Sequence, residues 1–150
     1  MKRLTIIIFL GIFAWGFANV QTAQAQTGEE LVNVCTKLVD DATYLKDYTV
    51  KLGAAAPGED PPSQKKSLML RKGTHYRFII CSSRDHPGRG ILKVYSSSKL
   101  LVSNYVPATG KIFRSVDFKC QRTGPYHMWV EFEDGKEGLA VVILSFVKKL

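Results

Sequence analysis

The sequence contains few of the residues from which common active sites are built. Its 150 residues include three cysteines and three histidines, and none of them stand at the spacing of a zinc site. The serine-elbow pattern Gly-x-Ser-x-Gly and the zinc-protease pattern His-Glu-x-x-His are both missing. The glycine pair around Arg89 is not followed by a helix that could cradle a phosphate. We therefore expect no metal, no cofactor and none of these hydrolase mechanisms.

Runs of one charge are also missing, although the chain is basic. It has 21 Lys and Arg against 13 Asp and Glu, a net charge of +8, but no Lys/Arg run exceeds two residues. Without clustered arginines or a recognisable motif, nucleic acid is excluded as a partner. The positive surface favours anionic partners such as acidic polysaccharides or acidic proteins. Its simpler interpretation is that the charge keeps the protein soluble.

The longest apolar run is confined to residues 1–25, which have the form of a signal peptide. Lys2 and Arg3 precede the apolar segment Leu4–Phe17, and Ala23–Ala25 gives the small-x-small cleavage pattern. The run is too short for a membrane span. We expect cleavage near Ala25 and export to the periplasm or the medium of a bacterium. The mature chain, residues 26–150, then has no transmembrane segment and the length of a single domain.

The mature chain is predicted to begin with a helix. Thr27 and Glu30 stand three residues apart, as in a capping box, and apolar residues follow at three- and four-residue steps. This pattern predicts a helix from about Gly28 to Asp41 that buries Leu31, Val34 and Leu38. Residues 44–52 fit either a strand or a continuation of the helix, and we take the strand because Tyr48-Thr49-Val50 has strand-forming chemistry.

The rest of the chain indicates β structure. Residues 53–63 contain three prolines and two glycines and are predicted to form a loop. From residue 66 to residue 147, short apolar segments alternate with turn signals at regular intervals. This pattern predicts a single antiparallel β-sandwich of jelly-roll type with seven or eight strands. The predicted strands cover residues 67–71, 75–83, 91–95, 100–105, 111–120, 126–133 and 139–147, and the last is apolar on both faces, as in a covered central strand.

The three cysteines favour one disulfide in an exported protein. Cys81 and Cys120 each end a predicted strand, so we expect a bridge between them. Cys35 stays open as an alternative partner. Three buried free thiols are the rival interpretation, since a buried cysteine packs as a small apolar residue.

Exposed aromatic residues are the clearest sign of a binding function. Alternation puts Met128 and Val130 on the core face of their strand and Trp129 on the opposite face. Tyr95 and Tyr105 flank a predicted turn. Flat apolar rings beside basic side chains are what a sugar- or protein-binding face needs. The alternative is that the leading helix, or a second layer, covers Trp129.

Acidic residues offer a weaker, catalytic alternative. Glu131 and Glu133 lie on the same side of one strand, as the paired carboxylates of a glycosidase would. Asp85 adjoins His86 and could orient its ring. Alternating charge on the wet side of a strand is the more ordinary explanation, so we do not expect an enzyme.

Three segments resemble the bacterial prepeptidase C-terminal (PPC) domain. They are Leu70–Phe78 (LRKGTHYRF), Gly90–Tyr95 (GILKVY) with Lys99–Leu101, and Thr123–Val130 (TGPYHMWV). The likeness covers about Leu68–Leu144, and the chain is also similar to small secreted proteins of Bacteroidetes-type bacteria. The resemblance implies a jelly-roll sandwich with a non-catalytic, surface-binding role. Gly88-Arg89-Gly90 replaces the acidic residues that often precede the middle strand, so the family's calcium binding is in doubt here.

These observations together predict an exported, non-catalytic binding module for a polysaccharide or an envelope protein. The alternatives are a structural subunit of the cell envelope without a small ligand and, third, a secreted hydrolase. The residues expected to contact the ligand are Tyr95, Tyr105, Trp129, Arg89, Lys93 and Arg114.

Overall fold

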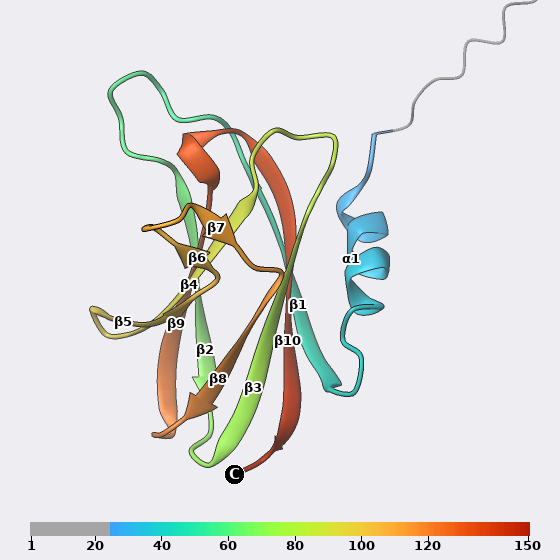
Figure 1. Ribbon diagram of the computed structural model, residues 1–150, viewed down its shortest axis with the longest axis vertical. Coiled ribbons are helices and arrows are strands. Elements are labelled where there is room, and N and C mark those ends of the chain that lie inside the picture. Colours follow the sequence, from blue (N-terminus) through green and yellow to red (C-terminus); the bar gives the residue numbers. More distant parts are fainter. Residues whose placement is uncertain (1–24) are drawn as a thin grey trace, which may run out of the picture.

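Two four-stranded antiparallel sheets pack face to face in the computed structural model, which describes residues 25–150 (Figure 1). The predicted signal peptide therefore lies outside the described residues, apart from Ala25. One sheet has the order β1-β10-β3-β8 and the other β2-β9-β4-β5. This connectivity is that of a jelly roll, so the predicted fold is confirmed. The strands are β1 (Thr43–Leu52), β2 (Ser63–Leu70), β3 (Thr74–Ser82), β4 (Gly90–Ser96), β5 (Lys99–Ser103), β8 (Ser115–Cys120), β9 (Gly124–Phe132) and β10 (Gly138–Lys149).

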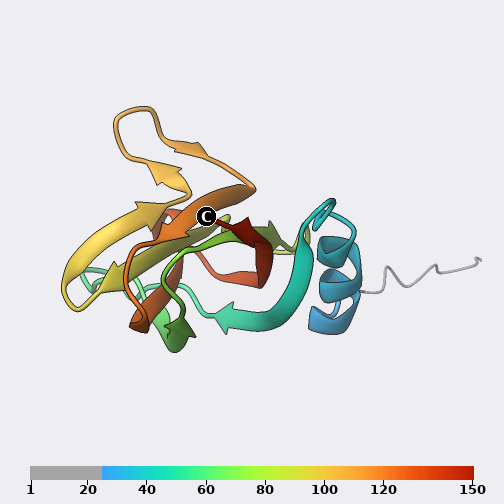
Figure 2. The same ribbon diagram turned by 90° about the horizontal axis from the view of Figure 1, so that it is seen from below.

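Two further strands of two residues each, β6 (Tyr105–Val106) and β7 (Lys111–Ile112), form a separate hairpin. It projects away from the sandwich (Figure 2). The sequence pattern had joined these residues to the longer strands on either side, as 100–105 and 111–120. The chain leaves the ladders at Asn104 and again at Phe113–Arg114, where it crosses from one sheet to the other.

The core follows the alternation of side chains along the strands. Met128, Val130 and Phe132 of β9 face the other sheet and are buried. β10 lies between β1 and β3, and its residues are buried on both faces from Gly138 to Ser145. The prediction of a covered central strand is confirmed. The ambiguous segment 44–52 is also a strand, because it pairs with β10 along almost its whole length.

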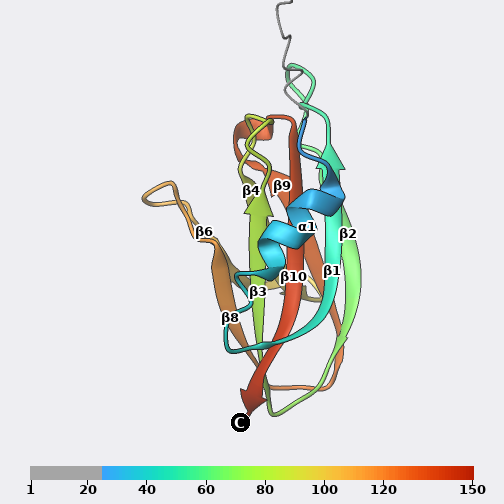
Figure 3. The same ribbon diagram turned by 90° about the vertical axis from the view of Figure 1, so that its right-hand side faces the viewer.

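Helix α1 (Gly28–Thr36) lies across the outer face of the β1-β10-β3-β8 sheet (Figure 3). The predicted capping box is present, because Thr27 Oγ1 accepts from the Glu30 amide and Glu30 from the Thr27 amide. The helix ends five residues earlier than predicted. The chain turns there instead, and Asp40 adopts a positive φ of 56°.

The buried stripe of α1 also differs from the prediction. Leu31 is buried as expected, but Val34 and Leu38 are 50% and 41% exposed. Cys35 and Val39 take their place against β10. Only one face of a helix can contact a sheet at a time. Because Leu31 and Cys35 form that face in α1, Val34 points to solvent.

The disulfide joins Cys35 to Cys81, and Cys120 is a buried free thiol. The predicted Cys81–Cys120 bridge is therefore wrong. Cys81 points to the outer face of β3, under the helix, whereas Cys120 points into the core between the sheets. In addition, Cys120 lies opposite Thr74, seven residues from Cys81 along β3. A separation of that kind is roughly 23 Å, far beyond disulfide reach.

Candidate functional site

The outer face of the β2-β9-β4-β5 sheet carries a compact group of aromatic and charged side chains. We call Lys65, Lys93, Tyr95, Trp129 and Glu131 the aromatic face. The ring centroids of Tyr95 and Trp129 are 4.8 Å apart, with their planes tilted by 40°. Lys65 of the neighbouring strand places its Nζ 3.8 Å from the centre of the Trp129 ring. Tyr95, Lys93 and Trp129, three of the predicted contact residues, are thus brought together.

Strand register explains why these side chains meet. Trp129 of β9 lies opposite Lys65 of β2 on one side and Lys93 of β4 on the other. Residues opposite each other in an antiparallel pair share a face, and their Cβ atoms are about 5 Å apart. Tyr95 is two residues beyond Lys93, so it reaches Trp129 along the diagonal. The inward neighbours, such as Met128 and Val94, are fully buried and hold the strands in place.

No other part of the described chain is packed over the aromatic face. The one α-helix within residues 25–150 covers the opposite sheet, so the alternative in which the leading helix buries Trp129 is wrong. Both Tyr95 and Trp129 are half-buried, chiefly by each other and by the flanking lysines. A ligand approaching this face meets ring surface without displacing an element of the fold.

Hydrogen-bonding groups border the rings. Lys93 Nζ contacts Glu131 Oε1 at 2.5 Å, and both side chains are about three-quarters buried. The pair leaves the second carboxylate oxygen of Glu131 free of partners among the described residues. Two aromatic rings bordered by the Lys93–Glu131 pair can pack on a ligand ring and hydrogen-bond to its substituents, once the Lys65 ammonium over Trp129 moves aside.

The remaining predicted contact residues lie elsewhere. Arg89 precedes β4 and forms a two-pronged ion pair with Glu133, with N···O distances of 2.6 and 2.7 Å. Tyr105 belongs to the projecting hairpin. Arg114 lies between β7 and β8, on a different surface. These three positions are near the aromatic residues in sequence, but the chain crosses between sheets before it reaches Arg114.

The carboxylates proposed for catalysis are occupied by basic or backbone partners. Hydrogen bonds from Arg89 hold the pKa of Glu133 below its ordinary value of 4.5, whereas a general acid needs a raised pKa. Glu131 is paired with Lys93. Asp85 accepts from the Gln26 amide, and no hydrogen bond joins it to His86 in the described part of the chain. These engagements argue against the hydrolase hypothesis.

Within residues 25–150, no group of three or more His, Cys, Asp and Glu side chains is arranged to hold a metal ion. No helix in the same range is long and apolar enough to cross a membrane.

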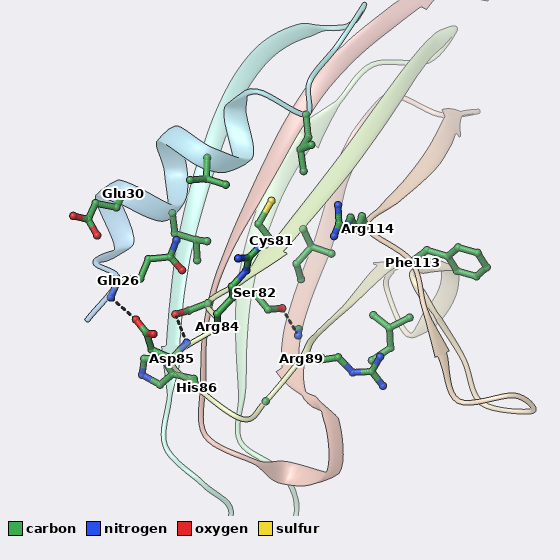
Figure 4. A pocket seen from close by; sticks show the side chains of 18 residues that line it. Gln26, Glu30, Cys81, Ser82, Arg84, Asp85, His86, Arg89, Phe113 and Arg114 are labelled. Carbon is green, nitrogen blue, oxygen red and sulfur yellow. Dashed lines mark hydrogen bonds between the residues drawn. The ribbon is translucent and has the colours of Figure 1, made fainter. Parts of the chain in front are cut away.

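A groove of about 1040 Å³ lies beside α1 (Figure 4). It is bounded by α1, by the end of β3, by the 83–90 loop and by residues 112–114. Arg84, Arg89 and Arg114 line it together with Glu30 and Asp85. Sequence reasoning did not find this groove, because its walls come from four separate segments that share no pattern.

No protein-family model and no curated protein matches the chain. Among solved structures, it is similar to Aeromonas hydrophila PliG, a periplasmic lysozyme inhibitor of g-type lysozyme. The two share 12% sequence identity with a TM-score of 0.46, over 71% of this chain and 86% of PliG. At this level of similarity the activity of the inhibitor is not carried over to the present chain.

Proposed function

We propose that the protein is an exported, non-catalytic binding module whose aromatic face takes a glycan. The observation that carries the proposal is the adjoining, tilted pair of Tyr95 and Trp129 on a sheet face that α1 does not cover. Sugar rings present flat C–H surfaces that pack on aromatic rings, while their hydroxyl groups need donors and acceptors at the edge. Lys93 and Glu131 provide both kinds of group next to the rings.

The rigidity of the sheet supports the same function. The inward residues of β4 and β9 are buried in the core, so the outward side chains are held on a fixed backbone. A pre-organised surface loses little conformational entropy when it binds. The positive charge of the chain, +8 overall, favours acidic polysaccharides among the glycans.

Retention on immobilised polysaccharides tests this function. The purified protein is applied to neutral and acidic polymers at low and moderate salt. We expect salt-resistant retention on one polymer and a loss of roughly tenfold or more in affinity for Trp129→Ala or Tyr95→Ala. The matched control is Tyr44→Ala, since Tyr44 is an exposed aromatic residue of β1 on the other sheet. Retention on every acidic polymer that salt abolishes would instead show that charge alone acts.

A second candidate is an interaction subunit that docks to an envelope protein through the β6–β7 hairpin. The observation in its favour is that the hairpin is held in a fixed position by Asn104. This side chain is 1% exposed and hydrogen-bonds to the backbone of Leu92, Gly90 and Phe113. It fixes both ends of the projecting hairpin, which exposes Val106 and Phe113. Co-purification with one fixed protein, lost on deletion of residues 106–110, would favour this candidate over glycan binding.

A further inference from the structure

The groove in Figure 4 contains the unpaired end of a strand. β8 pairs with β3 only as far as Ile79 of β3, which lies opposite Ser115 of β8. One more bond follows, from the Ile80 amide to the Arg114 carbonyl at 2.8 Å. β3 continues to Ser82 and still pairs with β10 on its other side. The last residues of β3 therefore form an open sheet edge inside the groove.

Alternation shows which backbone groups this edge presents. The amide of Ile80 points towards the β8 side, and the amide of Ser83 bonds to Leu139 on the β10 side. Backbone groups of every second residue point the same way along a strand. The N–H and C=O of Ser82 therefore point into the groove, where no strand of the described chain meets them. An extended segment of another chain can pair with such an edge.

The charges of the groove favour an acidic segment. Glu30 and Asp85 keep their negative charges, but both are hydrogen-bonded at the N-terminal end of α1, Glu30 to the Thr27 amide at 3.0 Å and Asp85 to the backbone nitrogen of Gln26. Arg89 is paired with Glu133. Arg84 and Arg114 are exposed and form no ion pair within residues 25–150. They lie on either side of the end of β3 (Figure 4), so two free guanidinium groups flank the open edge.

The helix side of the groove is apolar. Val34 and Leu38 line it and are 50% and 41% exposed, although neither is needed for the helix–sheet contact. A strand added beside β3 points alternate side chains to the helix side of the sheet. Apolar side chains at those positions would cover Val34 and Leu38.

We propose that this groove binds an extended acidic segment of a partner protein by adding it as a strand to the free end of β3. Backbone hydrogen bonds to Ser82 hold the segment, carboxylates of the segment pair with Arg84 and Arg114, and its apolar side chains pack on α1. A polysaccharide would use the arginines but could not complete the strand pairing, so the open edge favours a protein. The proposal does not depend on the aromatic face.

The test uses a fluorescent, blocked eight-residue peptide of alternating valine and glutamate and the purified protein. We expect saturable binding that Arg84→Gln/Arg114→Gln weakens by about tenfold, as two exposed ion pairs allow. The matched control is Arg71→Gln/Arg122→Gln, which makes the same charge change with two exposed arginines at the other end of the sandwich. The control is expected to change the affinity by less than about twofold.

Three further arms decide between strand addition and simple charge attraction. A peptide N-methylated at alternate amides should bind at least about tenfold more weakly, because it cannot pair with the edge. A valine–lysine peptide should not bind. Trp129→Ala should bind the acidic peptide like the unchanged protein. Equal binding of the N-methylated or lysine peptide, equal losses in the two double variants, or no binding of the acidic peptide would overturn the proposal.

Discussion

Asn104, the residue that follows β5, forms two hydrogen bonds with the backbone of Leu92 in β4. The Leu92 carbonyl accepts from the Asn104 amide at 3.2 Å, and the Leu92 amide donates to Asn104 Oδ1 at 2.7 Å. A side-chain amide thus takes the place of a strand carbonyl. Asn104 Nδ2 also donates to the carbonyls of Gly90 and Phe113, at 3.2 and 3.0 Å. One buried side chain therefore connects β4 with both ends of the projecting hairpin.

Replacing Asn104 with leucine should destabilise the protein by about 3 kcal/mol, because three buried backbone groups lose their partner. Urea unfolding measures the change. Asn33→Leu, at an exposed position of α1, is the control and should cost less than about 0.5 kcal/mol. A cost for Asn104→Leu as small as that of the control would show that the side chain does not hold the hairpin.

The Cys35–Cys81 disulfide should contribute about 3–4 kcal/mol, since it links residues 46 positions apart. Cys35→Ser and Cys81→Ser should each lower the urea midpoint, and peptide mapping of the oxidised protein should find Cys35 linked to Cys81. Cys120 should react with alkylating agents only after unfolding, because it is 1% exposed. A Cys81–Cys120 peptide in the map would contradict this assignment.

Truncation should cost less stability at Trp129 of β9 than at its neighbour Met128. Trp129→Ala should lower the free energy of unfolding by only about 1 kcal/mol, since Trp129 lies on the outer face and loses its contacts with Tyr95 and Lys65. Met128→Ala should cost about 2–5 kcal/mol, because Met128 is fully buried. Thermal melts of the two variants make the comparison. A large loss of stability in Trp129→Ala would place its ring in the core and weaken the proposed function.

Acid should weaken the contact between Arg89 and Glu133. Hydrogen bonds from Arg89 lower the pKa of Glu133 in the folded state below the ordinary value of 4.5. The unfolded chain therefore binds the proton more readily, so the contact stabilises the fold above pH 4.5 and is lost as the pH falls through the lower folded pKa. The Tm difference between the unchanged protein and Glu133→Gln should shrink from pH 6 to pH 3. A difference independent of pH would contradict the ion pair.

Local pattern was enough to find most of the fold. The alternation in β9 placed Trp129 outside and Met128 and Val130 inside, because successive side chains of any strand point to opposite faces. The Thr27–Glu30 capping box was readable because both partners lie within one turn. The apolar run in β10 showed a strand covered on both faces. The length of α1 was overestimated, because Val39 continues the apolar spacing from a turn and is still buried.

Three of the six predicted contact residues lie together on the aromatic face, and the other three lie elsewhere. Tyr95, Lys93 and Trp129 share a face because of strand parity, which the sequence reveals. Lys65 was missed, because its place beside Trp129 depends on the pairing of β2 with β9, two strands far apart in the chain. Arg89 and Arg114 were included for their nearness in sequence and Tyr105 because it flanks a predicted turn. Arg89 is paired with Glu133, Tyr105 lies in the projecting hairpin, and Arg114 follows the crossing to the other sheet.

The sequence by itself determined most of the elements, the inward and outward faces of the strands and the sandwich class, since these depend on spacings of two to four residues. Only the tertiary structure decided which sheet α1 covers, which cysteines pair and where the arginines gather. Those outcomes depend on strand order and register between segments far apart in the chain, such as Cys35 and Cys81, which are 46 positions apart. Side-chain periodicity describes the geometry of one element and does not indicate which distant element will lie beside it.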